Sequence, residues 1–366
     1  LTESRPVAVI TPSNSGAQNL AQELQFYVDL FAPATVRVIH LPSPEVDPYR
    51  GLSPHPEISS ARAKALWQLL HDGPRVLVAS ARAAAVRLHN SVRFLNNCLM
   101  IRQGEELAPE MLREHLFETG YVADDPVTDP GEFSLRGGIL DVFSPHMERP
   151  FRLEFFGDQI ESIRTFDVDS QRSIETAVSA EIIPMREYCV RRNLLREWAE
   201  KAPTLWTAPF LHHLEEELAQ ASQGELFPAF EFLLPAADPL DKTLFDYIQN
   251  FRLVVLEREV LDNTLEKMHA ELYERFVDRI EAHKPVLSPE QIYAEAEEFR
   301  NSIDRFPRVE IEELSLSDSG NSSIYVSSQS TRKYHGNLKE AIGDLNRFRE
   351  SGEKIAFIFS NPGRAE

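Results

Sequence analysis

The order of short apolar runs and helical patterns in the first hundred residues constrains the fold most. Apolar runs at 6–12, 36–41 and 76–79 are short and bounded by breaking residues, as buried strands are. Apolar residues at helical spacing follow N-capping residues at 13–15, and a second helix is predicted at 59–71. Strands that alternate with helices in this way form a parallel sheet covered by helices.

A different pattern begins near Asn96. Strand-like segments now lie close together, at 99–101, 139–143, 151–156 and 160–164. Every odd-numbered position of 151–156 is apolar, which is the period of a half-buried antiparallel strand. Together with a helix predicted at 110–119, these segments indicate a separate α+β module over about 98–188.

Helical patterns return after residue 190 and surround one buried strand, predicted at 253–256. A long amphipathic helix follows at 262–284, and we expect its apolar stripe to pack on its own sheet. Residues 315–323 have the composition of a linker. Beyond it, strands at 324–326 and 355–359 around a helix at 338–349 indicate the start of another α/β domain. The missing initiator Met and this unfinished unit predict a piece of a longer protein.

Charge and composition limit the function. The chain has 38 Lys+Arg against 58 Asp+Glu, a formal net charge of −20, which disfavours independent binding to nucleic acid. No apolar run is long enough for a membrane span, and the first residues do not resemble an export signal. The two cysteines, Cys98 and Cys189, fit buried inert thiols in a reducing cytoplasm.

Motifs for catalysis, cofactors and metals are missing from these residues. No Gly-x-x-x-x-Gly-Lys-Ser/Thr phosphate loop occurs, nor a Gly-x-Gly-x-x-Gly, His-Glu-x-x-His or Gly-x-Ser-x-Gly sequence. Glu257 and Glu259 could face magnesium at a strand end, but without a phosphate loop solvated carboxylates are the better interpretation. His212 and Glu216 share a helix face, yet zinc requires three or four ligands, so we favour a solvated face. We expect no catalytic, cofactor-binding or metal site here.

One segment concentrates unusual residues, at 131–143. Arg136 precedes paired glycines that permit a tight turn or close backbone approach before a strand. In the next strand Arg152 and Phe156 lie four residues apart and therefore point to one face. An exposed Phe beside Arg fits a protein interface, because both residue types dominate binding hot spots. Alternatively, Phe156 closes a small core and the arginines pair with Glu132 or Glu154.

These same residues carry a resemblance to a known family. An Arg-Gly-Gly-x-hydrophobic-Asp-hydrophobic-Phe sequence at 136–143, followed by Phe-Asp-x-x-Ser-Gln at 166–171, resembles the UvrA-interacting domain of the UvrB/Mfd family. Segments at 41–55, 306–309 and 334–337 are similar to the members of that family that couple transcription to repair. The resemblance implies a UvrA contact through Arg136, Arg152 and Phe156, and it makes Arg172 a weaker candidate.

The fold implied by the resemblance is an α/β multi-domain one. A degenerate, helicase-like parallel α/β domain is split by the inserted α+β UvrA-interaction domain and followed by a truncated α/β domain. The expected parts are the first half of the split domain at 1–97, the insertion at 98–188, the second half at 189–314, the linker at 315–323 and the truncated domain at 324–366.

The implied function is that of an amino-terminal adaptor that recruits UvrA to stalled RNA polymerase during nucleotide excision repair in the bacterial cytoplasm. RNA polymerase and double-stranded DNA would bind regions outside this chain, where ATP and Mg would serve downstream motor domains of a DNA translocase. In this family a distal domain is expected to mask the UvrA-binding face.

Two alternatives remain. A UvrB-like protein that binds damaged DNA with ATP needs a long aromatic hairpin in its first domain. Here only about 35 residues separate the strands ending near Leu41 and starting near Val76, and Tyr49 is the single Tyr between them. A free-standing regulatory fragment without a motor is the other alternative.

Overall fold

The computed structural model describes residues 5–31, 36–313, 324, 326 and 338–352. The chain divides into two compact units, 1–313 and 314–366. In the second unit the described residues form one helix, α13 (Leu338–Glu350), as the sequence predicts. Of the strand predicted at 324–326, Ile324 and Val326 are described and neither is in a strand. The strand predicted at 355–359 and the linker at 315–323 lie outside the described residues.

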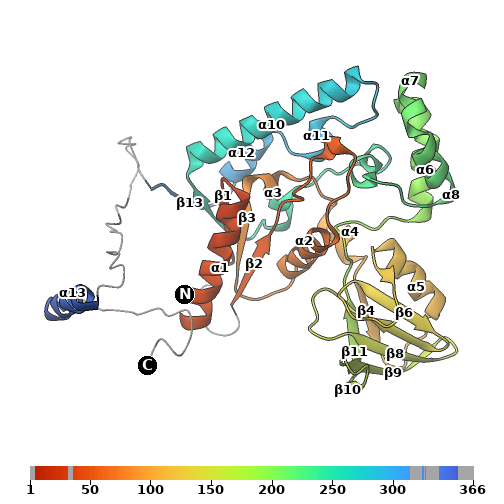
Figure 1. Ribbon diagram of the computed structural model, residues 1–366, viewed down its shortest axis with the longest axis horizontal. Helices are drawn as coiled ribbons and strands as arrows, with labels where there is room; N and C mark the ends of the chain where they lie inside the picture. The colour runs from red at the N-terminus through yellow and green to blue at the C-terminus, as the bar shows by residue number, and fades with distance from the viewer. Residues whose placement is uncertain (1–4, 32–35, 314–323, 325, 327–337, 353–366) are drawn as a thin grey trace. The chain divides into compact units, whose positions relative to one another are not determined.

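A five-stranded parallel sheet forms the centre of the first unit (Figure 1). Its strand order is β13-β12-β1-β3-β2. The strands are β1 (Val7–Thr11), β2 (Arg37–Leu41), β3 (Arg75–Ser80), β12 (Arg252–Leu256) and β13 (Arg308–Ile311). The first four confirm predicted strands. β13 was not predicted: its Val309 and Ile311 alternate with charged residues and all four of its residues are exposed, so it is not a buried apolar run. The sheet therefore joins segments on both sides of residues 99–188.

Alternate side chains of these strands build two helix-covered faces. Val9, Val78 and their neighbours pack on α1 (Asn14–Phe31). On the opposite face, Ala8, Ile10 and the other inward side chains join the largest core cluster with α2 (Pro56–Leu69) and α10 (Arg258–Glu281). The predicted stripe of the long helix does bury Leu265, Met268 and Leu272 in this core.

Two helices begin before the predicted residues. The helix predicted at 59–71 begins at Pro56, because Pro suits the first helical turn and His55 accepts the amide of Glu57. The long helix begins at Arg258, directly after Glu257 in the left-handed region. The other helices are α3 (Ala81–Ala85), α4 (Ser91–Leu95), α6 (Arg192–Leu205), α7 (Ala208–Leu211), α8 (Glu215–Gln223), α9 (Leu244–Tyr247), α11 (Pro289–Ile292) and α12 (Ala296–Asp304), with 3-10 turns η1 (Pro48–Arg50), η2 (His212–Leu214), η3 (Phe230–Phe232) and η4 (Leu234–Ala236).

A second sheet forms the module between α4 and α6. Its order is β10-β9-β8-β7-β6-β5, antiparallel except for the β5–β6 pair. The strands are β5 (Val122–Ala123), β6 (Glu132–Arg136), β7 (Ile139–Val142), β8 (Phe151–Phe156), β9 (Gln159–Phe166) and β10 (Ser173–Ala177). A separate antiparallel pair consists of β4 (Leu99–Arg102) and β11 (Ser179–Ile182).

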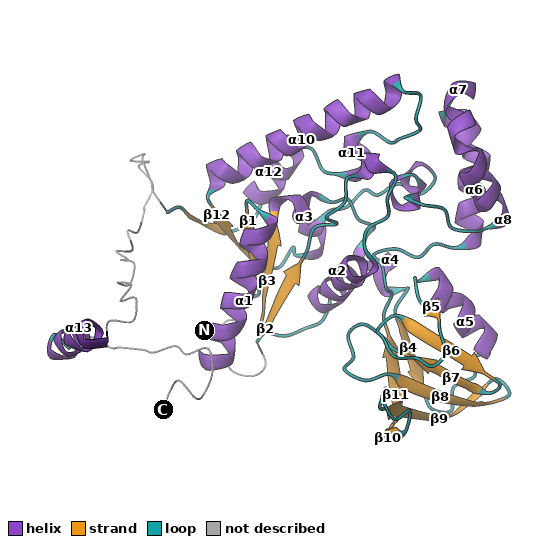
Figure 2. Cartoon of the chain, viewed as in Figure 1, coloured by secondary structure: helices purple, strands orange, loops and turns teal. Residues whose placement is uncertain are grey.

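The module has its own core. Leu112 and Leu116 of α5 (Pro109–Glu118) pack with Phe133, Leu140 and Leu153 of the sheet. Figure 2 shows α5 beside this sheet. The register shifts at Glu161 of β9, so Ile160 and Ile163 both face the core although they are three residues apart. The α+β character predicted for this segment is confirmed.

None of the described helices is long and apolar enough to cross a membrane.

Candidate partner-binding face

The side of the six-stranded sheet opposite α5 carries the predicted site residues, and we call it the outer face. It consists of Ser134, Arg136, Ile139, Asp141, Arg152, Glu154, Phe156, Ser162 and Arg164. Period-two alternation puts these residues on one side, because their neighbours in sequence pack into the α5-side core. At one end the face is covered by a small cluster of Val127, Phe143 and Phe166.

A buried carboxylate holds two of the predicted residues. Asp141 is 1% exposed and lies opposite Arg152 in the β7–β8 ladder. Arg152 donates from Nε to Oδ1 at 2.7 Å and from Nη2 to Oδ2 at 2.8 Å, and Arg136 Nη2 reaches Oδ2 at 3.1 Å. Such paired guanidinium contacts are the strong form of charge-assisted hydrogen bond. Asp141 is therefore the anchor of the polar part of the outer face.

Arg152 is largely committed to contacts within the module. Its Nη1 donates to the carbonyl of Gln171 at 3.1 Å, and its guanidinium carbon lies 4.5 Å from the ring centroid of Phe166. The Asp141 hydrogen bonds raise the pKa of the Arg152 guanidinium, more than burial lowers it. With a side chain only 16% exposed, Arg152 serves mainly to order the face.

Arg136 is more accessible. Its side chain is 50% exposed, and it bridges Asp141 to Asp125, whose carboxylate lies 3.0 Å from Nη1. Two acidic neighbours fix the direction of the guanidinium and leave half of its surface open to solvent. Arg136 can therefore offer donors to an acidic partner.

Phe156 is 77% exposed. It ends β8 at a two-residue turn, in which Gly157 has a φ of 61°, and it pairs with Gln159. Ile139, 38% exposed, lies opposite Glu154 on the adjacent strand, two residues before Phe156 along β8. A large ring left in water beside a second apolar side chain is the usual anchor of a protein interface.

The paired glycines make this arrangement possible. Gly137 adopts a φ of 58°, which only Gly tolerates easily. A Cβ on Gly138 would lie 2.8 Å from the carbonyl oxygen of Phe155, whose amide donates to the Gly138 carbonyl at 2.7 Å. The turn between β6 and β7 thus approaches the end of β8 closely, next to Phe156.

The second motif, at 166–171, orders the loop between β9 and β10, whose Gln171 carbonyl accepts from Arg152. Asp167 Oδ1 accepts from the amide and the hydroxyl of Ser170, which lowers the pKa of its carboxyl. Gln171, with a φ of 56°, donates from its side-chain amide to the carbonyls of Val127 and Val168. These roles are internal. Within the described part of the chain, no hydrogen bond or ion pair joins the Arg172 side chain to Asp141, Arg136 or Arg152.

The structure excludes the alternative in which Phe156 closes a small core and the arginines pair with Glu132 or Glu154. Phe156 closes no core. Neither arginine pairs with Glu132 or Glu154, because Glu132 accepts the amides of Thr128 and Asp129, and Glu154 pairs with Arg164 at 3.5 Å. The sequence analysis missed Asp141 as their partner. The available signal was a single acidic residue inside the apolar run at 139–143.

The other chemical hypotheses fall on surface residues. His212 Nδ1 lies 2.8 Å from Glu215 Oε1, and both side chains are exposed. Within the described ranges no group of three or more His, Cys, Asp or Glu side chains could hold a metal ion. Burial raises the pKa of the Cys98 thiol to about 12 and that of Cys189 to about 11. Neither thiol is therefore a reactive thiolate at neutral pH.

Comparison with known proteins matches a family to the segment that contains the outer face. Residues 99–188 match the UvrB interaction domain family. The chain is 27% identical to the transcription-repair-coupling factor of Escherichia coli (strain K12) over 368 residues, which cover 99% of this chain and 31% of that protein. The corresponding Haemophilus influenzae protein is 28% identical over 368 residues, covering 98% and 31%.

A third relative, the transcription-repair-coupling factor of Myxococcus xanthus, is 33% identical over 262 residues, covering 67% of this chain and 21% of that protein. The chain thus spans about 31% of the length of the first two relatives. Residues 99–188 therefore match the UvrB interaction domain family, and the chain over nearly its whole length is similar to the amino-terminal part of the transcription-repair-coupling factors.

Proposed function

We propose that this chain is the amino-terminal adaptor part of a transcription-repair coupling factor, and that its outer face binds UvrA. The observation that carries the proposal is the exposure of Phe156 on the same face of the sheet as Arg136, whose direction is fixed by the buried Asp141. The chain would recruit UvrA to stalled RNA polymerase in the bacterial cytoplasm. A UvrB-like damage-binding subunit is the less favoured function, since its aromatic hairpin has no counterpart between β2 and β3.

The face has the chemistry that a transient protein interface requires. Its apolar centre is Phe156 with Ile139, and Arg136 supplies charge at the rim. Aromatic residues and arginine are enriched at such sites, and an ordered side chain loses less entropy on binding. The acidic balance of the chain matters less here, because charges beyond about 8 Å are screened at physiological salt.

The proposed architecture is a helicase-like α/β domain interrupted by the UvrA-interacting insertion, with its halves at 1–97 and 189–314 and the insertion at 98–188. Its support is the parallel sheet, in which β3 and β12 lie on either side of β1 although the insertion separates them in sequence. ATP and Mg would serve motor domains elsewhere in the whole protein, together with sites for RNA polymerase and double-stranded DNA. For this chain we propose no cofactor.

The test separates contact residues from ordering residues. UvrA is titrated calorimetrically into the chain and into its Arg136→Ala and Arg152→Ala variants. Arg136→Ala should lower the affinity by on the order of 1–3 kcal/mol with unchanged stability, because the side chain is half-exposed. Arg152→Ala should lower both affinity and stability, because it leaves the buried Asp141 carboxylate underpaired.

A matched control is Arg102→Ala, which removes an exposed arginine of the same module that pairs only locally with Glu105. It should bind UvrA like the unmodified chain. Wild-type affinity for the Arg136→Ala variant would remove Arg136 from the interface.

A further inference from the structure

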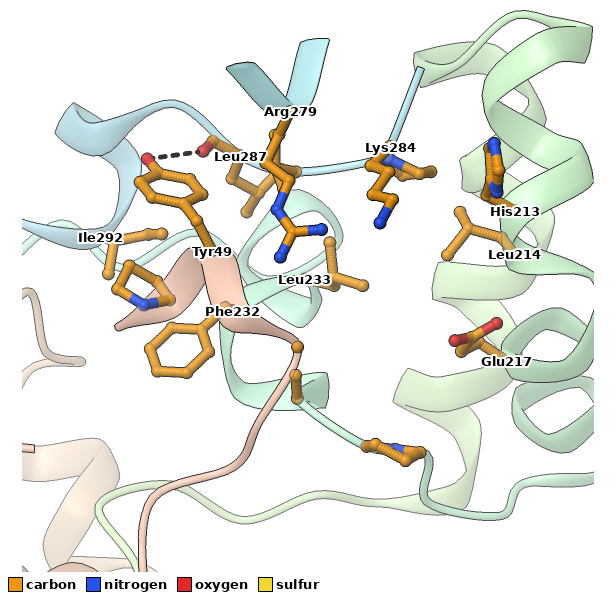
Figure 3. A pocket seen from close by; sticks show the side chains of 16 residues that line it. Tyr49, His213, Leu214, Glu217, Phe232, Leu233, Arg279, Lys284, Leu287 and Ile292 are labelled. Carbon is orange, nitrogen blue, oxygen red and sulfur yellow. Dashed lines mark hydrogen bonds between the residues drawn. The ribbon is translucent and has the colours of Figure 1, made fainter. Parts of the chain in front are cut away.

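A pocket of about 320 Å³ lies between η1, α8 and the loop after α10 (Figure 3). All the residues that line it are outside the segment 99–188 that carries the outer face. Its walls are mostly apolar, with Tyr49, Leu214, Phe232 and Ile292 among them. The Tyr49 hydroxyl donates to the carbonyl of Leu287 at 3.1 Å, which ties η1 to the opposite wall. The volume is at the lower end of the range of about 300–1,000 Å³ for small-molecule sites.

Two basic side chains line this pocket without a counter-ion. The arginines Arg258 and Arg275 of α10 hold ion pairs, with Asp262 at 3.0 Å and Asp47 at 2.9 Å. Arg279, in the last turn of the same helix, and Lys284 hold none among the described residues, and both line the pocket in Figure 3. The two cations therefore give the pocket a positive charge within an acidic chain of 58 acidic and 38 basic residues.

The loop after α10 is built so that Lys284 turns back toward the pocket. His283 adopts a φ of 54°, and the amide of Lys284 donates to the carbonyl of Arg279 at 2.8 Å, as in a helix C-cap. The His283 ring packs against Phe210 with centroids 5.4 Å apart. This wall is therefore fixed by contacts and is not a loose surface loop.

The opposite wall stores backbone strain. Ala229 is buried with a φ of 58°, a conformation that costs energy for a residue with a Cβ. Ser53 holds it, since its hydroxyl accepts the Ala229 amide at 3.0 Å and donates to Glu231 at 2.7 Å. Strain that is maintained by specific contacts gathers at binding sites.

We infer that this pocket binds a small organic anion, with its carboxylate or phosphate on Arg279 and Lys284 and its apolar part against Leu214 and Phe232. Arginine meets both anions through two parallel hydrogen bonds, and lysine adds a point charge. Glu217 lines the same pocket and is its one carboxylate. Two cations against one carboxylate leave a positive site, and Glu217 weakens its affinity for anions.

The test uses the 366-residue chain with methyl-labelled Leu and Ile, and follows Leu214 and Ile292 by NMR. Benzoate and phenyl phosphate should shift these methyl signals saturably, and neutral benzyl alcohol should bind at least tenfold more weakly. Arg279→Gln should weaken binding about fivefold to tenfold, the effect of one charge-assisted hydrogen bond. Glu217→Gln should strengthen it severalfold.

Lys267→Gln is the matched control, because Lys267 is an exposed cation of the same helix outside the pocket. It should bind both probes like the unmodified chain. The inference is overturned if neither anion binds saturably, if benzyl alcohol binds as tightly as benzoate, or if Glu217→Gln and Arg279→Gln change affinity in the same direction. Unchanged methyl signals outside the pocket establish that each variant is folded.

Discussion

The two arginines of the outer face, Arg136 and Arg152, are held in position by one buried carboxylate. Asp141 is hardly exposed, yet two guanidinium groups that reach the surface converge on it. A carboxylate in such a position is costly to bury unless its partners remain in place. The direction of Arg136 toward a partner protein therefore depends on a residue that the partner would not contact.

Asp141→Asn should lower the free energy of unfolding by about 2–4 kcal/mol, because an amide accepts fewer of the arginine hydrogen bonds and leaves Arg152 without its counter-charge. Urea denaturation measures the change. Asp158→Asn, in the exposed turn after β8, is the control and should stay within about 0.5 kcal/mol of the unmodified chain. Equal stability of the two variants would contradict the anchor role.

A second residue-scale effect concerns pH. His146 lies in the loop between β7 and β8, and its ring centroid is 4.6 Å from that of Trp67 of α2. Burial, with smaller contributions from Lys64 and His71, lowers the pKa of His146 to about 4. The unfolded chain, with a histidine pKa near 6.5, therefore binds more protons between these values. The neutral form stabilises the fold fully above about pH 6.5, and this contribution is lost as the pH falls toward 4.

His146→Gln should therefore flatten the decline of unfolding free energy between pH 6.5 and 4.5. The difference in slope should be roughly 0.5–1 kcal/mol per pH unit after allowance for partial exposure. Urea denaturation at several pH values measures it. Parallel slopes for the unmodified chain and the variant would contradict a buried neutral His146.

At the scale of elements, the glycine turn between β6 and β7 determines how β7 and β8 approach each other. Gly137 requires a left-handed backbone but has open space around it. Gly138 has the reverse constraint, because it needs no left-handed backbone but a Cβ there would lie 2.8 Å from the carbonyl oxygen of Phe155. Substitutions at the two positions therefore test backbone strain and steric contact separately.

Gly137→Ala should cost about 1 kcal/mol of stability, the usual penalty for a side chain in the left-handed region. Gly138→Ala should cost more, since the new Cβ would overlap a carbonyl that cannot rotate away. Thermal denaturation of the two variants tests this order. A smaller loss for Gly138→Ala than for Gly137→Ala would show that the turn relaxes freely.

Elements with strong apolar signals could be predicted from the sequence, and those held by backbone pairing could not. The strands β1, β3 and β12 are buried apolar runs and were predicted. β13 and β10 consist almost wholly of exposed residues, so only their ladder hydrogen bonds define them. The exposure of Phe156 followed from alternation along β8. The choice of Asp141 as partner needed the register between β7 and β8, which local sequence does not specify.

At the scale of the whole molecule, the net charge of −20 bears on whether the partner is a protein or a nucleic acid. Phosphate contacts require clustered lysine and arginine, and acidic side chains pair with many of the arginines here. The charge therefore favours the proposed adaptor role over independent binding to DNA.

Fluorescence anisotropy with a labelled DNA duplex at 0.15 M salt should accordingly show no saturable binding by this chain, with any Kd weaker than about 10⁻⁴ M. The same assay at low salt is the control for weak electrostatic attraction. Micromolar binding at 0.15 M salt would contradict the adaptor interpretation and favour a UvrB-like role.

The central claim is that the exposed ring of Phe156 is the core of the UvrA contact. The most direct measurement is the calorimetric affinity of UvrA for the unmodified chain, for Phe156→Ala and for Met111→Ala. Met111 is also an exposed apolar residue, 66% accessible, but it lies on α5 at the other side of the sheet. We expect Phe156→Ala to lose about 1–3 kcal/mol of binding free energy while Met111→Ala binds normally. Normal binding by a folded Phe156→Ala variant would contradict the account.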